Sequence, residues 1–129
     1  MGRLATIGRD GQPHITPLTY VYNPIEDSID LGGVDFVNTK KWRDVQRNRK
    51  ATFLVDDFAP AEAHAVEIRS EAEVHHSGGG KINPRFPNFV DQFIRLRPTY
   101  IVSGGVNTQS SGRASGFKTD GRRVGGTQA

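Results

Sequence analysis

Residues 65–74 alternate strictly between small or apolar side chains and charged ones, and this pattern restricts the fold more than any other part of the chain. Successive side chains of a β-strand point to opposite faces of the sheet. One face would then carry Val66, Ile68, Ser70, Ala72 and Val74, and the other would carry Glu67, Arg69, Glu71 and Glu73. A long strand with one apolar and one charged face is typical of an antiparallel sheet that covers a core on one side.

The rest of the chain predicts further short strands. Asp10-Gly11 stands between residues 3–7 and 14–22, two runs with many apolar and β-branched side chains, and this arrangement is typical of a β-hairpin. Pro17 lies inside the second run and favours an edge strand or a bulge, because proline cannot donate to the ladder. Three more strands are expected, at residues 29–31, 51–55 and 99–102. We therefore predict a mainly β fold, a small six-stranded antiparallel barrel.

Two short helices are expected beside these strands. Between Asn38 and Arg47 the apolar residues Trp42 and Val45 are three positions apart and charged residues fill most other positions, which indicates a helix with a narrow buried stripe. Asn38 or Thr39 would cap its start. The apolar spacing of Phe86, Phe89, Val90 and Phe93, with Pro87 in the first turn, predicts a second helix.

Length and composition exclude several classes of protein. The 129 residues suffice for one domain, and the absence of cysteine rules out disulfides, thiolate metal sites and a cysteine nucleophile. No apolar run approaches the roughly 20 residues that span a bilayer, and the start has no signal-peptide pattern. We therefore expect a cytoplasmic protein that does not interact with membranes.

The net charge of +3 resides at the C-terminal end. Residues 1–110 hold 13 basic and 13 acidic side chains, so nucleic-acid binding is not expected. After Asn107 the composition turns to Gly, Ser, Thr and Arg. We expect one folded domain at residues 1–106 and a mobile tail at residues 107–129.

A cluster of donors stands at the start of the first expected helix. Thr39, Lys40, Lys41 and Arg43 would place a hydroxyl, two ammonium groups and a guanidinium beside free backbone N–H groups. A helix start of this kind suits a phosphate, because its N–H groups and partial positive charge attract anions. The alternative is a basic helix that is simply solvated.

A second candidate is the strand that begins at His14. His14 and Thr16 would share one face and could line a ligand pocket, although an exposed strand histidine is the alternative. His75 and His76 are adjacent and would point to opposite faces, so no metal site is expected. The glycine pairs do not form a dinucleotide-binding fingerprint. No self-sufficient catalytic set is present, and an enzyme of this kind would depend on a bound cofactor.

Four stretches in sequence resemble one known family. Residues 2–14 (GRLATIGRDGQPH) are similar to the opening hairpin of the pyridoxamine 5'-phosphate oxidase-like split β-barrel proteins, and within them to the F420-dependent oxidoreductases of actinobacteria. The other three stretches agree in order and spacing, and they are residues 30–45, residues 47–57, and the glycine run 78–80 with residues 84–99. The resemblance covers residues 2–106.

The resemblance implies a homodimer of six-stranded FMN-binding split barrels, with the cofactor in a groove between the subunits. In this family Thr39, Lys40 and Lys41 would hold the cofactor phosphate. His14, Thr16 and Pro17 would lie beside the flavin or deazaflavin ring, and the cofactor would approach the backbone at Gly32 and Gly33.

The function implied is hydride transfer between the deazaflavin F420 and a small organic substrate. An FMN-binding oxidase or reductase of the same fold is the first alternative, and a flavin- or deazaflavin-binding protein without turnover is the second. No residue of the sequence stands out as the catalytic acid or base.

Overall fold

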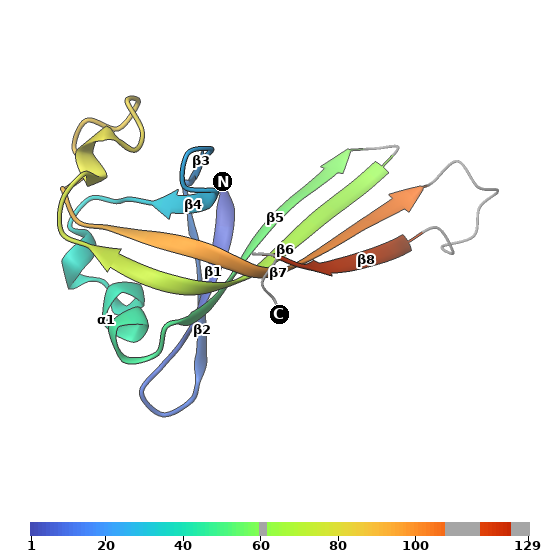
Figure 1. Ribbon diagram of the computed structural model, residues 1–129, viewed down its shortest axis with the longest axis horizontal. Coiled ribbons are helices and arrows are strands. Elements are labelled where there is room, and N and C mark those ends of the chain that lie inside the picture. Colours follow the sequence, from blue (N-terminus) through green and yellow to red (C-terminus); the bar gives the residue numbers. More distant parts are fainter. Residues whose placement is uncertain (60–61, 108–116, 125–129) are drawn as a thin grey trace.

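The computed structural model describes residues 1–59, 62–107 and 117–124. These residues form one sheet of eight antiparallel strands with a single α-helix (Figure 1). The strands are β1 (Gly2–Ile7), β2 (Pro13–Leu18), β3 (Val21–Asn23), β4 (Ser28–Leu31), β5 (Lys50–Ala59), β6 (Glu62–His75), β7 (Phe93–Asn107) and β8 (Phe117–Arg123). The helix is α1 (Lys40–Arg47), and two short 3-10 turns are η1 (Phe36–Asn38) and η2 (Gly79–Lys81).

The strand order makes the sheet curl into a barrel. The strands lie in the order β2-β1-β5-β6-β7-β4-β3, with β8 added to β7. β2 and β3 are at opposite ends of this order, yet only Thr19 and Tyr20 separate them in the chain. Three Cα steps span at most about 11 Å, so the two ends of the sheet must be close neighbours. The expectation of a mainly β, antiparallel fold is confirmed.

The core lies inside this curled sheet and is closed at one side by α1. Leu4, Leu31, Phe53, Ile94 and Leu96 come from four different strands, β1, β4, β5 and β7, and are completely buried. Trp42 and Val45, the two apolar residues predicted for one stripe of the helix, are buried against the same cluster. Burial of large apolar side chains from so many elements is the main source of stability for a domain of this size.

The alternation in β6 is confirmed. Ile68, Ser70 and Ala72 are buried, whereas Arg69 and Glu71 are exposed. The Asp10-Gly11 hairpin between β1 and β2 is also confirmed, with Gly11 at a φ of 83°. This left-handed conformation favours glycine.

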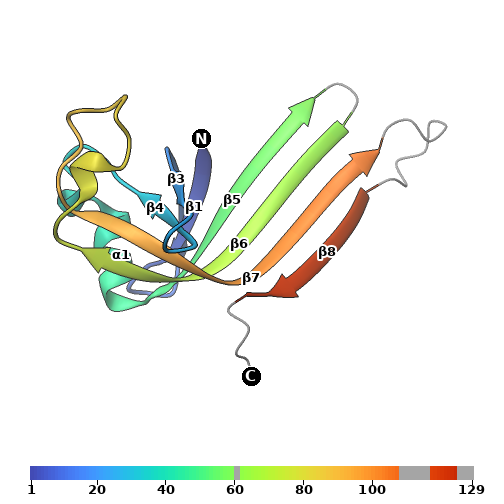
Figure 2. The same ribbon diagram turned by 45° about the horizontal axis from the view of Figure 1, so that its top comes forward.

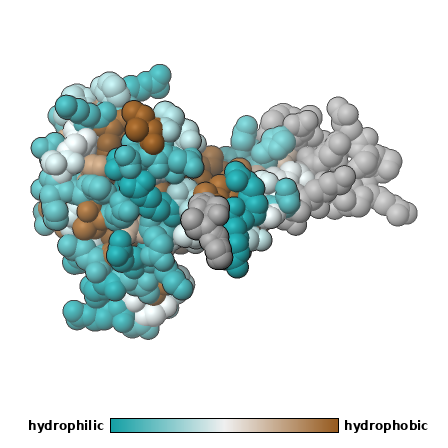
Figure 3. Space-filling model, in the orientation of Figure 1, coloured by the Kyte–Doolittle hydropathy of each residue, from teal (hydrophilic) through white to brown (hydrophobic). Residues whose placement is uncertain are grey.

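The second halves of β5 and β7 and the first half of β6 extend away from the barrel as an arm (Figures 1 and 2). β1 covers β5 only at Arg3–Ala5 against Thr52–Leu54, and β4 covers β7 only at Ile94–Leu96. Beyond these contacts β5, β6 and β7 continue together, and β8 pairs with β7 from Tyr100 to Val106. In the view of Figure 3 the barrel surface is mainly hydrophilic, with small separate apolar patches.

The predicted number of strands and helices needs correction. The structure has eight strands instead of six, because the run at 14–22 is divided into β2 and β3 and because β8 was not expected. Within the tail expected at 107–129, Phe117–Arg123 form β8 and pair with β7, while 108–116 and 125–129 lie outside the described residues. The strand expected at 99–102 is part of β7, which already begins at Phe93.

The second predicted helix is wrong. Residues 83–92 form turns, with the Phe86 N–H donating to the Asn83 carbonyl and the Phe89 N–H donating to the Phe86 carbonyl. The Phe89 ring lies against Gly32, and Phe93 already belongs to β7. Among the described helices, none has the length and hydropathy needed to cross a membrane.

Candidate functional site

Thr39 begins α1 and its hydroxyl is already engaged there. The side chain accepts a hydrogen bond from the Trp42 N–H at 3.4 Å and donates one to the Phe36 carbonyl at 2.6 Å. Thr39 is therefore the N-cap predicted from the sequence. With the Trp42 N–H satisfied by this cap, the N–H groups of the first helical residues, Lys40 and Lys41, are the ones left for an anion.

Lys40 is held by a buried carboxylate. Asp44 is completely buried and pairs with the Lys40 ammonium at 3.3 Å and with the Arg47 guanidinium at 2.8 Å. The Thr6 hydroxyl donates a third contact to Asp44 at 2.9 Å. Burial raises the pKa of Asp44, but the hydrogen bonds from Thr6 and Lys40 outweigh it and leave that pKa below its usual value. The charge of Lys40 is therefore already partly neutralised.

Lys41 differs from Lys40 because the described residues give it no carboxylate partner. Its ammonium lies 5.5 Å from the centre of the Phe36 ring, and the side chain is half-buried. Burial lowers the pKa of Lys41. A partly desolvated ammonium beside free helix N–H groups is a binding position for an anion.

Arg43 lies on the exposed side of the same turn. Its guanidinium donates to the Asn38 carbonyl at 3.1 Å, so the side chain folds back over the start of α1. An exposed arginine in this position can approach a ligand bound at the helix start, but it does not enclose one.

The strand β2 brings His14 close to the helix. The His14 ring packs on Gly8, where an added Cβ would lie 2.9 Å from Nε2. The carboxylates of Asp10 and Asp44 both interact electrostatically with His14, and Asp10 also interacts with Lys40. His14 and Lys40 therefore belong to one cluster around a buried carboxylate.

Thr16 and Pro17 lie on opposite faces of β2. Thr16 is paired with the buried Leu4 and is half-buried, so it shares the face of His14. Pro17 is paired with Arg3 and is exposed on the outer face. β2 is an edge strand, as the position of Pro17 predicted. Pro17 does not, however, share a surface with His14 and Thr16.

Gly32 and Gly33 connect β4 to the turn before α1. An added Cβ at Gly32 would lie 2.8 Å from the Phe89 ring, so the space beside this glycine is filled by a side chain of the protein. A Cβ added at Gly33 would have the Phe36 ring as its nearest neighbour, at 3.6 Å. The Gly33 carbonyl accepts a hydrogen bond from the Val90 N–H at 3.1 Å.

Two groups of predicted residues thus meet at α1. Gly33 and Lys41 both lie near the Phe36 ring, and the Thr39 hydroxyl donates to the Phe36 carbonyl. Lys40 pairs with Asp44, and His14 lies near enough to interact electrostatically with the same carboxylate. Pro17 and Gly32 belong to neither group.

Sequence reasoning missed Asp44 and Phe36. A signal for Asp44 was available, since it is the one acidic residue of a basic helix and lies four positions after Lys40 and three before Arg47. Phe36 carried no comparable signal, because its role depends on a turn that packs it against Gly33.

Known proteins resemble this chain in sequence. Residues 1–96 match the family described as pyridoxamine 5'-phosphate oxidase. A protein of Streptomyces rimosus named 5a,11a-dehydrotetracycline/5a,11a-dehydrooxytetracycline reductase is 34% identical over 108 residues, which cover 81% of this chain and 74% of the reductase.

Solved structures show the same fold at lower identity. The FAD-binding protein of Mycobacterium smegmatis has a TM-score of 0.62 and 20% identity, covering 82% of this chain and 84% of its own. A structure named F420 reductase has a TM-score of 0.59 and 18% identity, covering 78% and 86%. The matched residues and the split-barrel architecture agree, and the chain belongs to the pyridoxamine 5'-phosphate oxidase family.

Proposed function

We propose that this protein is an oxidoreductase that binds the deazaflavin F420 with its phosphate at the start of α1. The observation that carries this proposal is Lys41, a half-buried ammonium without a carboxylate partner among the described residues, placed beside free helix N–H groups. Phosphate supplies the negative charge that this position lacks.

The residues at the helix start would have different roles in binding the phosphate. Thr39 fixes the backbone of the first turn through its cap, and the N–H groups of Lys40 and Lys41, as first residues of the helix, have no intrahelical acceptor. The Lys41 ammonium would pair with the phosphate, while Lys40 remains shared with Asp44. The reduced deazaflavin, when bound, supplies a hydride to an unsaturated organic substrate. The protein would orient that substrate and exclude water.

The relatives support a reductase and leave two cofactors in competition. The Streptomyces rimosus relative is named a reductase of dehydrotetracyclines, and solved structures of the same fold are named for F420 and for FAD. F420 carries an acidic oligoglutamate tail, and the exposed guanidinium of Arg43 would be available to it. FMN, whose single phosphate suits the same helix start, is the second candidate. A carrier that binds the cofactor without turnover is the third.

We also propose that two copies of the chain form a homodimer through the outer face of the sheet, with the small-molecule substrate in the groove between them. On this face Ile15 is 68% exposed and lies opposite Ala5. A pocket of about 520 Å³ lies beside it, with Ile7, Thr52 and Arg69 in its lining. An exposed apolar residue next to a pocket is a common feature of interfaces.

A pair of fluorescence titrations tests the cofactor. Purified, dialysed protein is titrated with F420 and separately with FMN. Saturable binding of F420 with much weaker binding of FMN supports the proposal, and the reverse result assigns the protein to the flavin-binding members. Absence of binding in both titrations would reject the phosphate site.

Turnover is tested separately. Reduced F420 is mixed with the protein and a panel of enones and quinones, and oxidation is followed by absorbance. Tight F420 binding without oxidation by any substrate would favour the carrier over the reductase.

A further inference from the structure

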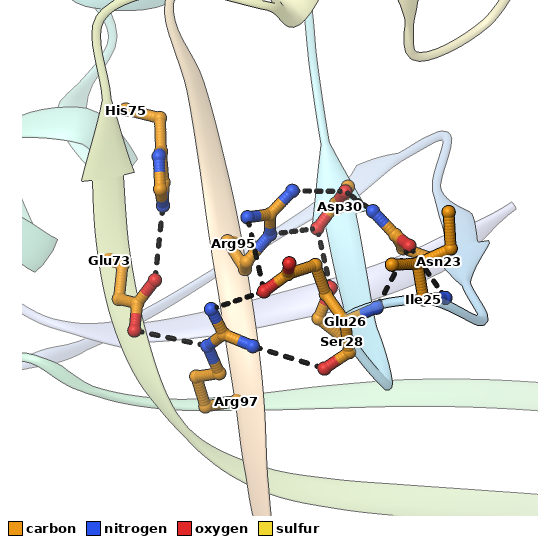
Figure 4. A network of polar contacts seen from close by, with 9 residues as sticks. All are labelled: Asn23, Ile25, Glu26, Ser28, Asp30, Glu73, His75, Arg95 and Arg97. Carbon is orange, nitrogen blue, oxygen red and sulfur yellow. Dashed lines mark hydrogen bonds and ion pairs between the residues drawn. The ribbon is translucent and has the colours of Figure 1, made fainter.

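A network of charged side chains joins the β3–β4 hairpin to the C-terminal end of β6 and the first residues of β7 (Figure 4), and it includes no residue of α1. Arg95 on β7 binds both oxygens of Asp30 on β4, with Nε and Nη2 at 3.0 and 3.1 Å. Arg97 bridges Glu73 and Glu26 at 3.1 and 2.8 Å. The network holds three strands in register, and it also forms one wall of a pocket.

This pocket measures about 460 Å³, within the range of small-molecule sites. Segment 77–82 covers one side of it, and the hairpin and the strand ends form the other sides. The lining residues that matter for ligand chemistry are Tyr22, Asp30, His75, Lys81, Phe93 and Arg95. None of them belongs to the candidate cofactor site at α1.

Asp30 is the one carboxylate among the lining residues of this pocket, and its charge is already balanced by hydrogen-bond donors. Asp30 is 5% exposed and accepts four hydrogen bonds, two from Arg95 and one each from Ser28 and Asn23. Burial raises the pKa of Asp30, but the hydrogen bonds from Arg95, Asn23 and Ser28 have the larger opposite effect. The pKa of Asp30 therefore lies below its usual value. Asp30 is therefore a charged, fully satisfied anchor for Arg95 and does not attract a metal or an amine.

Donors in the same lining remain available. Arg95 has a side chain only 14% exposed, and among the described residues its Nη1 has one long contact, 3.7 Å to Glu26. Lys81 is exposed and has no ion pair within the described ranges. His75 uses Nε2 on Glu73 at 3.0 Å, which leaves its other ring nitrogen for a further contact.

Aromatic rings form the apolar part of the pocket. The His75 and Phe93 rings stack at 4.8 Å with an interplanar angle of 15°, and the Arg95 guanidinium lies 5.2 Å from the centre of the Phe93 ring. Tyr22 adds a third ring, half of it exposed. Flat rings beside a fixed guanidinium and a free ammonium match a small planar molecule that carries an oxyanion.

We propose that this pocket binds a small molecule bearing a carboxylate or phosphate, with the oxyanion between Arg95 and Lys81 and the apolar part against His75 and Phe93. The site is separate from the cofactor position at α1, and it does not depend on the identity of the cofactor. The Arg95–Asp30 pair is the built part of the site, because bidentate pairing and burial fix the guanidinium before any ligand arrives.

Two probes test the site on the full chain labelled with nitrogen-15. Benzoate carries a carboxylate on a flat ring, and inorganic phosphate carries an oxyanion alone. Amide shifts are followed during titration to about 20 mM, since a fragment of this size binds with a dissociation constant on the order of 1 mM. We expect saturable shifts at Gly78 and Lys81 with benzoate.

Two lysine variants separate this site from the one at α1. Lys81→Gln should weaken benzoate binding about fivefold or more, and Lys41→Gln should leave it within about twofold. Unchanged circular dichroism spectra show that each variant is folded. Saturation by phosphate as strongly as by benzoate supports the oxyanion site and assigns it to free phosphate.

Three results would overturn the proposal. The first is the absence of saturable shifts around the pocket with either probe. The second is equal affinity of the parent protein and Lys81→Gln for benzoate. The third is a set of shifts confined to the start of α1.

Discussion

The Thr6 hydroxyl on β1 donates a 2.9 Å hydrogen bond to Asp44 on α1, and the carboxylate that receives it is completely buried. This contact joins the helix that carries the candidate phosphate site to the first strand of the barrel. It also orients the carboxylate that holds Lys40 and Arg47.

Replacing Thr6 by valine should destabilise the fold by about 1–3 kcal/mol, because a buried carboxylate oxygen loses its donor. Thr6→Ser keeps the hydroxyl and is the matched control, with an expected loss smaller than that of Thr6→Val. Urea denaturation followed by tryptophan fluorescence measures both, since Trp42 lies on the same helix. Equal stability of the valine variant and the parent would show that the contact contributes nothing.

The carboxylates of Asp44, Asp30 and Glu73 should make stability fall in acid. In each, burial raises the pKa but donors outweigh it, so the folded pKa lies below the usual value. A lowered folded pKa contributes stability that is present above the unfolded pKa, about 4, and is lost as pH falls through the folded pKa.

Asp44→Asn provides the comparison for the acid effect. The variant starts less stable at neutral pH, and its free energy of unfolding should fall less steeply below about pH 4, because one carboxylate no longer titrates. Urea titrations at a series of pH values measure the two slopes. Parallel curves for the two proteins would contradict the assignment.

Lys41 should contribute more to cofactor binding than Lys40. Removing Lys41 takes away a half-buried ammonium without a carboxylate partner among the described residues, whereas the Lys40 ammonium is shared with Asp44. We expect Lys41→Gln to weaken F420 or FMN binding by about tenfold or more and Lys40→Gln by about threefold. The fluorescence titration measures both, with Lys81→Gln as the control. A larger effect of Lys40 would reverse the assignment.

Gly121 should be required for β8 to lie on the arm. An added Cβ would be 2.7 Å from the Tyr100 hydroxyl and 2.9 Å from its ring, so a side chain there must displace Tyr100. Gly121→Val should therefore raise amide hydrogen exchange along β8 by about tenfold or more, with little effect on the barrel. Arg122→Val, on the other face of the same strand, is the control and should leave exchange nearly unchanged.

Ile15 tests the proposed dimer. A charge at this exposed position should split the assembly if the outer face of β2 is buried between two copies. Ile15→Asp is compared with the parent by light scattering during gel filtration, with Asp91→Asn as an exposed control. A monomeric parent protein would remove this part of the proposal.

Strands could be predicted where apolar and polar residues alternate along the sequence. The pattern in β6 is local and strong, and the Asp10-Gly11 hairpin needs only the residues of the turn. β8 has few apolar residues, and it forms by pairing with β7, which already extends beyond the barrel. A strand of this kind is determined by a nonlocal contact, which a window of sequence does not contain.

The second predicted helix failed for a related reason. Phe86, Phe89, Val90 and Phe93 have helical spacing, but the three phenylalanine rings do not pack on one common surface. Phe86 and Phe89 stack on each other at 5.2 Å, and Phe93 joins the sheet beside His75. The tertiary contacts overrode the periodicity.

The candidate site was predicted as a group of cations and could not be ranked from the sequence. Four donors at one helix start look equivalent in a linear chain. Only the fold shows that Asp44 is buried beneath Lys40, that Arg43 turns back on Asn38 and that Lys41 lies over Phe36. Availability for a ligand is a property of these contacts.

The short overlap between β1 and β5 has a consequence for solubility. Beyond Leu54 the outer edge of β5 has no strand partner among the described residues, and an exposed edge of this kind is a template for adding a strand of another molecule. The chain places Asp56 and Asp57 on this edge, and Arg3 pairs with Asp56 at 2.6 Å. Because Asp56 is already paired with Arg3, the repulsion of the same segment in a second copy would come mainly from Asp57, and it would oppose edge-to-edge aggregation of the arm.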